Sequence, residues 1–297
     1  MKNWNPHNIR DSKSGELLGY VDDFTNLKLT LYKSLLEKFE KIENTISIII
    51  QGPLNERSIN TIPAYLKYGE VIVSCWDTDE ISRLDEYKNH IKIIVNNYHD
   101  VISKARRTNQ KNPLILQNYT TLKGLQQSKS YFAIKTRSDE SYPNLDPLIN
   151  LLKNNRDTKD PQTGIYNCYK IITSNIYFRY DKQCKFHPSD HLIAGRTSRM
   201  LDIFQNSYSR CCLGQIHGLD PEQVIGQSVI ETYFDPILKF RGRPNPHRSI
   251  EQMKKHFDII RIRDLPQCTW TSSYRKYDAL TGEEDWCHHI NEIDKYS

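Results

Sequence analysis

Four short apolar segments separated by helix-like stretches constrain the fold of this chain most strongly. They are residues 46–50 (ISIII), 70–75 (EVIVSC), 91–95 (IKIIV) and 131–135 (YFAIK). β-Branched and aromatic side chains, which favour strands, dominate these segments. Helical patterns lie between them, near residue 58 and at residues 118–128. Since strands that alternate with helices form parallel sheets, the sequence predicts an α/β fold with a Rossmann-type, mostly parallel sheet flanked by helices.

Candidate ligand-binding residues stand at or just after the end of each predicted strand. They are Gln51, Gly52 and Pro53 in the first case, Trp76, Asp77 and Asp79 in the second, Asn96 and Asn97 in the third, and Lys135, Arg137, Asp139 and Glu140 in the fourth. The carboxyl ends of parallel strands meet at one edge of a sheet, where α/β proteins bind their ligands. We therefore expect these residues to form a single cleft, although loops are polar in any case.

The charges after the fourth strand suit a phosphate group that is bound together with a cation. Lys135 and Arg137 can donate to phosphate oxygens, and the Asp139 carboxylate is a ligand for Mg²⁺ or Mn²⁺. The alternative is an exposed strand end whose charges offset one another.

The first two strand ends predict contacts with the rest of a nucleotide. Gly52 lets a ligand approach the backbone, and Trp76 offers an aromatic face to a base or a sugar. Asp77 and Asp79 are placed to accept hydrogen bonds from ribose hydroxyls, or alternatively to begin a turn or helix. Neither the GxGxxG nor the GxxxxGK[ST] pattern occurs, so a dinucleotide site or P-loop has no support.

The second half of the chain contributes candidate acceptor-binding and catalytic residues. His187, Ser189 and Asp190 lie in a segment that reads HPSDH, where Pro188 argues against a zinc-binding helix. We expect His187 and Ser189 to position an acceptor. Glu222 lies in the first turn of a predicted helix, whose dipole favours the ionised carboxylate. It is therefore a candidate general base. The alternative is a carboxylate that only stabilises the start of the helix.

A basic stretch at residues 239–248 (KFRGRPNPHR) is predicted to be a loop. Such a loop can close over a diphosphate, and His247 within it is a further candidate metal ligand. The alternative is a solvated basic loop.

The composition is that of a globular protein, with 37% hydrophobic and 26% charged residues. A net charge of +5, with 36 acidic residues, is too small to indicate nucleic-acid binding. The seven cysteines form no CxxC pair and resemble reduced intracellular thiols. We find no signal-peptide pattern and no run of about 20 apolar residues, which favours a cytoplasmic protein and leaves peripheral membrane contact open.

Several of these motifs together resemble the WavE-type family of lipopolysaccharide-synthesis glycosyltransferases. The resemblance covers residues 45–235 and rests on residues 48–53 (IIIQGP), 73–76 (VSCW), 124–125 (GL), 134–139 (IKTRSD), 187–190 (HPSD) and 221–223 (PEQ). It implies a single GT-A-like domain. Residues 45–150 would form its nucleotide-sugar-binding half, and residues 151–297 its acceptor-binding half and C-terminal segment. Residues 1–44 are expected to be an N-terminal arm with an amphipathic helix.

The resemblance also implies a reaction, the transfer of a sugar from a nucleotide-sugar donor to a hydroxyl of a surface glycan, in lipopolysaccharide, capsule or a viral glycan. GT-A enzymes hold a divalent cation with an Asp-x-Asp motif, whereas this chain has Arg137 in place of the first aspartate. Asp139 is then the expected metal ligand, and Arg137 an alternative phosphate contact. Glu222 or Asp190 is the expected base of an inverting reaction. In a retaining reaction, Glu222 would orient the acceptor.

Two other functions remain open at this point. A sugar nucleotidyltransferase usually has a glycine-rich basic loop after the first strand, which residues 51–57 (QGPLNER) match poorly. A nucleotide-sugar-binding or carbohydrate-binding protein without catalysis is the second alternative.

Overall fold

The computed structural model describes residues 45–107, 112–154, 170–176, 178, 186–214, 219, 221–233, 253 and 256–270. The chain divides into two compact units, residues 1–44 and residues 45–297, and every described residue belongs to the second. The predicted N-terminal helix and the basic stretch at residues 239–248, with His247, lie outside the described residues.

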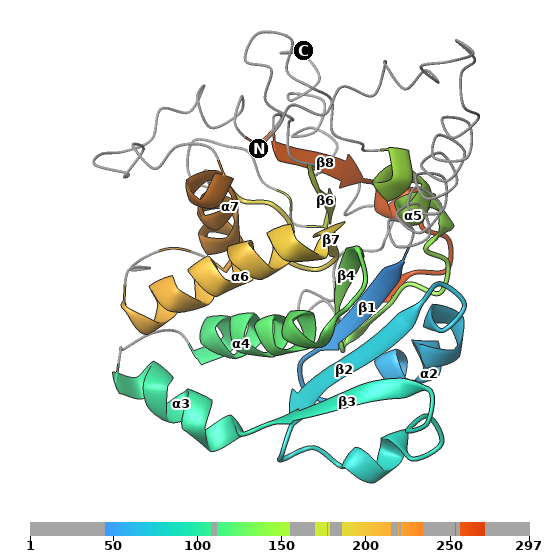
Figure 1. Ribbon diagram of the computed structural model, residues 1–297, viewed down its shortest axis with the longest axis horizontal. Helices are drawn as coiled ribbons and strands as arrows, with labels where there is room; N and C mark the ends of the chain where they lie inside the picture. Colours follow the sequence, from blue (N-terminus) through green and yellow to red (C-terminus); the bar gives the residue numbers. More distant parts are fainter. Residues whose placement is uncertain are drawn as a thin grey trace, which may run out of the picture. The chain divides into compact units, whose positions relative to one another are not determined.

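A seven-stranded mixed sheet forms the centre of the described structure (Figure 1). Its strands are β1 (Ile46–Gln51), β2 (Glu70–Trp76), β3 (Ile91–Asn96), β4 (Phe132–Arg137), β6 (Ile171–Ser174), β7 (Ile193–Arg196) and β8 (Phe257–Ile260), in the order β3-β2-β1-β4-β7-β6-β8. Strands β1 to β4 are parallel, β7 runs antiparallel to β4 and β6, and β8 is parallel to β6. The predicted α/β fold with a mostly parallel sheet is therefore confirmed.

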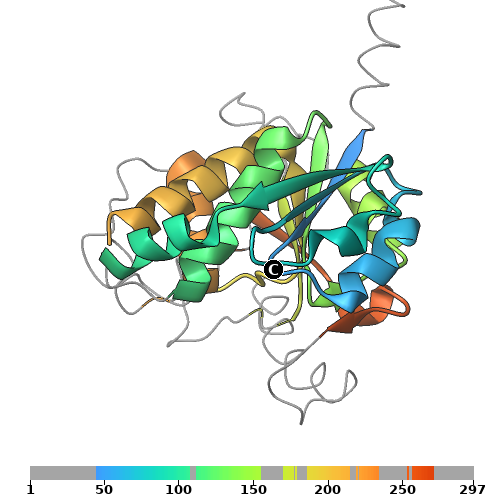
Figure 2. The ribbon, with the colours of Figure 1, turned by 90° about the horizontal axis from the view of Figure 1, so that it is seen from below.

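Helices cover both faces of this sheet. They are α2 (Glu56–Tyr65), α3 (Tyr98–Arg107), α4 (Asn112–Gln127), α5 (Asp146–Asn154), α6 (Thr197–Cys212) and α7 (Pro221–Tyr233), with short 3₁₀ turns at Ile81–Leu84 and Ile262–Asp264. Helices α2 and α5 lie on one face, and α4, α6 and α7 lie on the other (Figures 1 and 2). A small antiparallel pair, β5 (Glu140–Ser141) and β9 (Thr269–Trp270), lies apart from the main sheet.

The alternation of side chains along β1 produces this three-layer packing. Ile48 and Ile50 belong to the core cluster under α2 and α5, whereas Ile49 packs with Leu125 of α4 and Phe204 of α6. Successive strand residues point to opposite faces of a sheet, so an unbroken apolar strand needs a cover on both sides. The isoleucines of segment 46–50 point to both faces, so this strand suits the covered, central position that it has.

Some element boundaries differ from the sequence-based expectation. Strand β4 continues through Arg137, because its last residues pair with Ile50 and Gln51 of β1 after the apolar pattern has ended. Helix α4 begins at Asn112, six residues before the predicted start, and Pro113 suits its first turn. Strand β6, which pairs with β7 and β8, ends at Ser174, and Ile176 lies in a turn.

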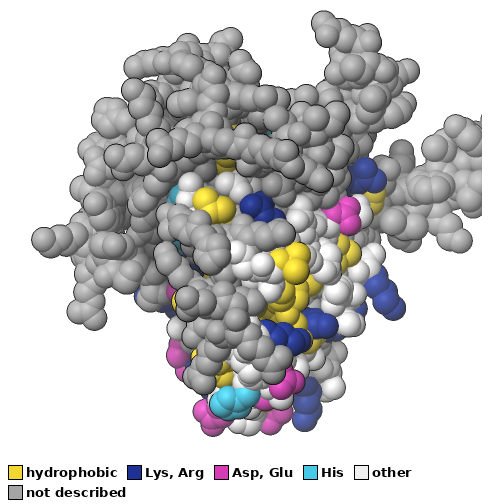
Figure 3. Space-filling view, turned by 90° about the vertical axis from the view of Figure 1, so that its left-hand side faces the viewer, with side chains coloured by type: hydrophobic (Ala, Val, Ile, Leu, Met, Phe, Trp, Pro, Cys, Tyr) yellow, Lys and Arg dark blue, Asp and Glu magenta, His cyan; other side chains and the backbone are white. Residues whose placement is uncertain are grey.

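One side of the molecule shows apolar and basic side chains next to one another (Figure 3). Among the described residues, Val95 and Leu213 are the large hydrophobic residues that are exposed. Single exposed apolar side chains are normal on protein surfaces and do not by themselves identify an interaction surface. No helix in the described part of the chain is long and apolar enough to cross a membrane.

Candidate functional site

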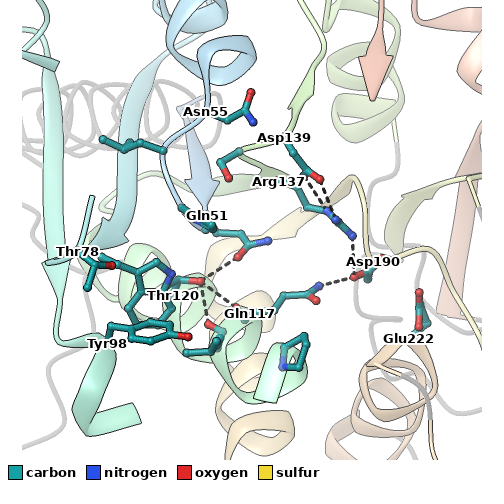
Figure 4. Close-up of a pocket in the computed structure, with 17 residues that line it drawn as sticks. Gln51, Asn55, Thr78, Tyr98, Gln117, Thr120, Arg137, Asp139, Asp190 and Glu222 are labelled. Atoms are coloured by element: carbon teal, nitrogen blue, oxygen red, sulfur yellow. Dashed lines mark hydrogen bonds and ion pairs between the residues drawn. The ribbon is translucent and has the colours of Figure 1, made fainter. Parts of the chain in front are cut away.

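A pocket of about 700 Å³ opens at the edge of the sheet where β1, β2 and β4 end (Figure 4). Eight of the residues expected to form a site line it: Gln51, Gly52, Pro53, Trp76, Arg137, Asp139, Asp190 and Glu222. Six of them belong to strand ends or to the turns that follow, because parallel strands deliver their carboxyl ends to the same edge. Asp190 precedes β7, and Glu222 belongs to α7, so tertiary packing brings these two to the pocket.

The turn after β1 depends on the glycine at position 52. Gly52 has a φ of +111°, and a Cβ atom there would meet the Ser138 Oγ atom at 2.9 Å. The amide of Ser138 donates to the carbonyl of Gln51 at 2.9 Å, which ties the two strand ends together. Only glycine adopts this backbone conformation without strain. Because Gly52 has no side chain, the backbone stays accessible at this wall of the pocket.

Arg137 is surrounded by three carboxylates. Its Nε and Nη2 atoms donate to Oδ1 and Oδ2 of Asp139, both at 3.0 Å. Its Nε atom also lies 3.4 Å from Glu140 Oε1, and its Nη1 atom lies 3.8 Å from Asp190 Oδ2. The guanidinium therefore has a fixed position at the pocket wall, held from several directions (Figure 4).

Lys135 lies beneath the pocket and does not line it. Its ammonium group is fully buried and donates to the main-chain carbonyl oxygens of Asp190 and His191. Burial lowers the pKa of Lys135, although the nearby carboxylates of Asp190 and Glu140 oppose this effect. The structure therefore gives Lys135 the role of anchoring the segment that carries Asp190.

Asp190 is almost fully buried and held in its ionised form. Gln117 Nε2 donates to its Oδ2 atom at 2.5 Å. Burial by itself would raise the pKa of Asp190, but the positive charges of His191, Lys135 and Arg137 outweigh burial and hold it well below the usual range. A carboxylate stabilised in this way is a poor proton acceptor.

A second buried pair supports Arg137 from behind. His191 Nδ1 makes a hydrogen bond with Glu140 Oε1, and the Tyr142 hydroxyl donates to Glu140 Oε2 at 2.8 Å. Burial opposes protonation of His191, but Glu140 and Asp190 outweigh it and raise the pKa of His191. The buried side chains of this cluster thus balance positive against negative charge.

Glu222 faces the pocket from the first turn of α7. Its Oε2 atom lies 3.6 Å from Nε2 of the buried His187. Helix α7 approaches residues 186–188 closely, since a Cβ atom on Gly226 would meet the Phe186 carbonyl oxygen at 2.2 Å. His187 does not line the pocket itself, but it contacts the carboxylate that does.

The pocket lining also leaves out five residues that were expected at a site, namely Asp77, Asp79, Asn96, Asn97 and Ser189. Asp77 Oδ1 accepts a hydrogen bond from the Tyr98 amide at 3.0 Å, and Asp79 Oδ2 accepts one from the Trp76 amide at 2.8 Å. Both carboxylates therefore shape the turns after β2 and β3. The Ser189 hydroxyl is fully buried and lies 2.9 Å from the Ser174 hydroxyl.

Helix α4 supplies polar residues that the sequence interpretation missed. Gln117 contacts Asp190, and the Thr120 hydroxyl donates to Gln51 Oε1 at 2.9 Å. The other lining residues that were not predicted are Leu54, Asn55, Thr78, Tyr98, Pro113, Leu116 and Ser138. The spacing of Gln117 and Thr120 places them on one helix face, which is the signal that the sequence offered.

The carboxylates of the pocket have the chemistry of a hard-cation site without forming a complete one. Asp139, Asp190 and Glu222 all present oxygen, which Mg²⁺ and Mn²⁺ prefer. In the described ranges no group of three or more His, Cys, Asp or Glu residues is placed to hold an ion. A cation here would need oxygens from a bound ligand, as Mg²⁺ commonly takes from substrate phosphates.

The fold and the pocket define an α/β protein with a pocket at the carboxyl ends of parallel strands. A family model described as WavE lipopolysaccharide synthesis matches residues 46–213. The chain therefore belongs to the WavE family, which is involved in lipopolysaccharide synthesis. The matched region includes every lining residue except Glu222. No curated protein matches the chain significantly.

Proposed function

We propose that this protein is a GT-A-like glycosyltransferase that moves a sugar from a nucleotide-sugar donor to a hydroxyl of a growing surface glycan or glycolipid. One observation carries the proposal. In a chain of a lipopolysaccharide-synthesis family, a guanidinium, three carboxylates and aromatic side chains line one pocket at the carboxyl edge of a parallel sheet. A nucleotide-sugar presents groups that suit each of these, namely a diphosphate, sugar hydroxyls and a planar base.

The apolar part of the pocket suits the base of the donor. The rings of Trp76 and Tyr98 meet edge to face, with their centroids 5.5 Å apart, and both residues line the pocket. Gly52 keeps the neighbouring backbone accessible, so a diphosphate can pass it towards Arg137. Asp77 and Asp79 do not line the pocket, so we assign the ribose contact to Thr78 between them, which does.

The donor set of the pocket fits a divalent cation whose coordination the diphosphate completes. We assign Asp139 as the ligand from the chain, because it is the carboxylate next to Arg137 at the end of β4. Mn²⁺ or Mg²⁺ bound there would neutralise charge that develops on the departing nucleoside diphosphate. His247, the other ligand expected from the sequence, lies outside the described residues.

We assign Glu222 as the general base of an inverting transfer. It lines the pocket, its side chain is 16% exposed, and it lies in the first turn of a helix, where the dipole favours the ionised form. Asp190 is the weaker candidate, because its low pKa and its bond to Gln117 make it reluctant to accept a proton. In a retaining reaction, Glu222 would instead orient the acceptor hydroxyl.

A thermal-shift screen tests the donor part of the proposal. A bound ligand stabilises the folded protein by about 2.7 kcal/mol when its concentration is 100 times its dissociation constant. We expect one nucleotide-sugar to raise the melting temperature, more so with Mn²⁺ than without it. Trp76→Ala should weaken this shift, whereas Trp76→Phe should retain much of it. The absence of a shift with every nucleotide-sugar would contradict the proposal.

The transfer reaction itself requires a second experiment. The donor found in the screen is incubated with lipopolysaccharide cores or capsule fragments, and release of the nucleoside diphosphate is compared with the appearance of an extended glycan. Donor binding without transfer to any acceptor would favour the alternative of a binding protein that lacks catalysis.

A further inference from the structure

Each carboxylate that lines the pocket is already engaged by groups of the chain itself. Arg137 binds both oxygens of Asp139, Gln117 binds Asp190, and His187 lies beside Glu222. A divalent cation needs the lone pairs of deprotonated oxygens, so it must compete with these partners. The competition is strongest at Asp139, where the guanidinium engages both carboxylate oxygens at once.

Arg137 is anchored in a way that lets it release Asp139 without losing its place. Glu140, at 3.4 Å from the Arg137 Nε atom, has no exposed side-chain surface, and Asp190, at 3.8 Å from Nη1, is only 3% exposed. The Asp139 side chain is 29% exposed and lies on the pocket side. Asp139 is therefore the most accessible of the three carboxylates around the guanidinium.

A diphosphate offers the guanidinium an equivalent set of acceptors. Arginine binds phosphate oxygens with the same two parallel hydrogen bonds that it makes to a carboxylate. A donor that reaches Arg137 can therefore replace Asp139 as its partner. The Asp139 oxygens then become accessible to a cation, and the diphosphate supplies further oxygens for it.

We infer that the Arg137–Asp139 pair makes cation binding dependent on the donor. Without a nucleoside diphosphate, Arg137 occupies Asp139 and the pocket binds Mn²⁺ or Mg²⁺ weakly. With one, Arg137 binds the diphosphate and Asp139 becomes a metal ligand. This inference rests on the proposed function, because it requires that the pocket bind a nucleoside diphosphate.

Manganese binding by the whole chain tests the inference without any transfer reaction. Free Mn²⁺ is measured by its electron paramagnetic resonance signal, in titrations with Mn²⁺ alone and with UDP, GDP, ADP or dTDP. In the parent protein we expect the best nucleotide to tighten Mn²⁺ binding by about tenfold or more, which corresponds to about 1.4 kcal/mol. In Arg137→Gln we expect Mn²⁺ alone to bind about tenfold more tightly than in the parent.

Two further variants show where any new manganese binds. The double variant Arg137→Gln/Asp139→Asn should lose the gain, since the freed carboxylate is then absent. Lys170→Gln is the matched control, because Lys170 binds Asp258 at 3.0 Å and neither residue lines the pocket. Lys170→Gln frees the carboxylate of Asp258, whose side chain is 29% exposed, like that of Asp139. This variant should leave manganese binding unchanged. Thermal unfolding confirms that each variant is folded. Arg137→Lys keeps the positive charge, so in the absence of a nucleotide it should bind Mn²⁺ more weakly than Arg137→Gln does.

The possible results separate the inference from the function on which it rests. If the parent binds Mn²⁺ alone as tightly as with the best nucleotide, or if Arg137→Gln gains nothing, the inference is wrong while the proposed function stands. If none of the four nucleotides binds with or without Mn²⁺, the proposed function is overturned, and the inference with it.

Discussion

The guanidinium of Arg137 binds both carboxylate oxygens of Asp139, two positions further along the chain, with two N–O distances of 3.0 Å. Alternate residues of an extended chain point to the same side. Here β4 ends at Arg137 and β5 begins at Glu140, so Asp139 lies in the turn between them, two positions after Arg137. The pair places a cation and an anion at the wall of the same pocket.

Replacement of Asp139 by asparagine should abolish transfer and leave the fold intact. The change removes one charge without changing the shape, and we expect turnover to fall by about 10²-fold or more, as for other groups that stabilise developing charge. The free energy of unfolding should change by about 1 kcal/mol or less, because the lost ion pair is partly exposed. Turnover and thermal unfolding are measured on the same preparation.

Asp258→Asn provides the control for this substitution. Asp258 binds Lys170 at 3.0 Å, and its side chain is as exposed as that of Asp139. It does not line the pocket, so turnover should stay at the parent level. Near-normal turnover of Asp139→Asn would remove Asp139 from the mechanism.

Glu222→Gln should lower the rate of an inverting transfer by about 10²–10⁴-fold, because the amide cannot accept the proton of the acceptor hydroxyl. Donor binding, measured by thermal shift, should change little. Glu86→Gln, at an exposed position outside the pocket, serves as the control and should retain full turnover. A rate within a few-fold of the parent for Glu222→Gln would place the base elsewhere.

The buried pair of His191 and Glu140 should make stability depend on pH. The pKa of His191 is raised above its ordinary value of 6.5, so the folded protein binds this proton more tightly than the unfolded chain. The resulting contribution to the free energy of unfolding is fully present below 6.5 and is lost as the pH rises through the raised pKa. Urea unfolding at about pH 6 and about pH 8.5 measures the difference.

Two variants identify the group responsible. His191→Gln should be less stable than the parent at the lower pH and should lack this part of the decline towards higher pH. His90→Gln removes an exposed histidine and should retain the decline of the parent. Equal pH dependence in the parent and in His191→Gln would show that another group causes it.

Gly52→Ala should destabilise the protein by about 1–3 kcal/mol, because a φ of +111° strains any residue with a side chain. A second cost is the contact of the new Cβ atom with Ser138 Oγ at 2.9 Å. Adding Ser138→Ala removes only that contact, so the double variant should recover part of the loss. Chemical denaturation gives both values, and complete recovery would show that backbone strain contributes nothing.

The sequence predicted the strands within residues 45–150 well and the polar residues at their ends in part. Isoleucine occupies every position of segment 46–50 except Ser47, and all of these residues are buried, as in a strand in the middle of a covered parallel sheet. The residues that follow this strand and the parallel strands beside it then lie at the same edge of the sheet, because the carboxyl ends of parallel strands meet there. This is why Gln51, Trp76 and Arg137 were expected together and line one pocket.

Other members of the pocket were not predictable in the same way. Asp77 and Asp79 follow a strand as a ribose-binding carboxylate would, yet each accepts a hydrogen bond from a backbone amide. A short acidic side chain in a turn suits both roles, and a linear sequence does not distinguish them. Gln117 and Thr120 of α4 were missed because a polar helix position has the same pattern whether it faces water or a pocket.

The sequence by itself determined the fold class, the central strands and the order of the polar strand ends, because strand periodicity and glycine placement act over a few neighbouring residues. Only the tertiary structure decided which carboxylates line the pocket and which partners they bind. Asp190 and Glu222 reach Arg137 and the pocket from segments more than 50 residues farther along the chain. The protonation of these carboxylates depends on neighbours that are distant in the sequence. The electrostatic interaction is set by the distance between two charges in space, whatever their separation along the chain.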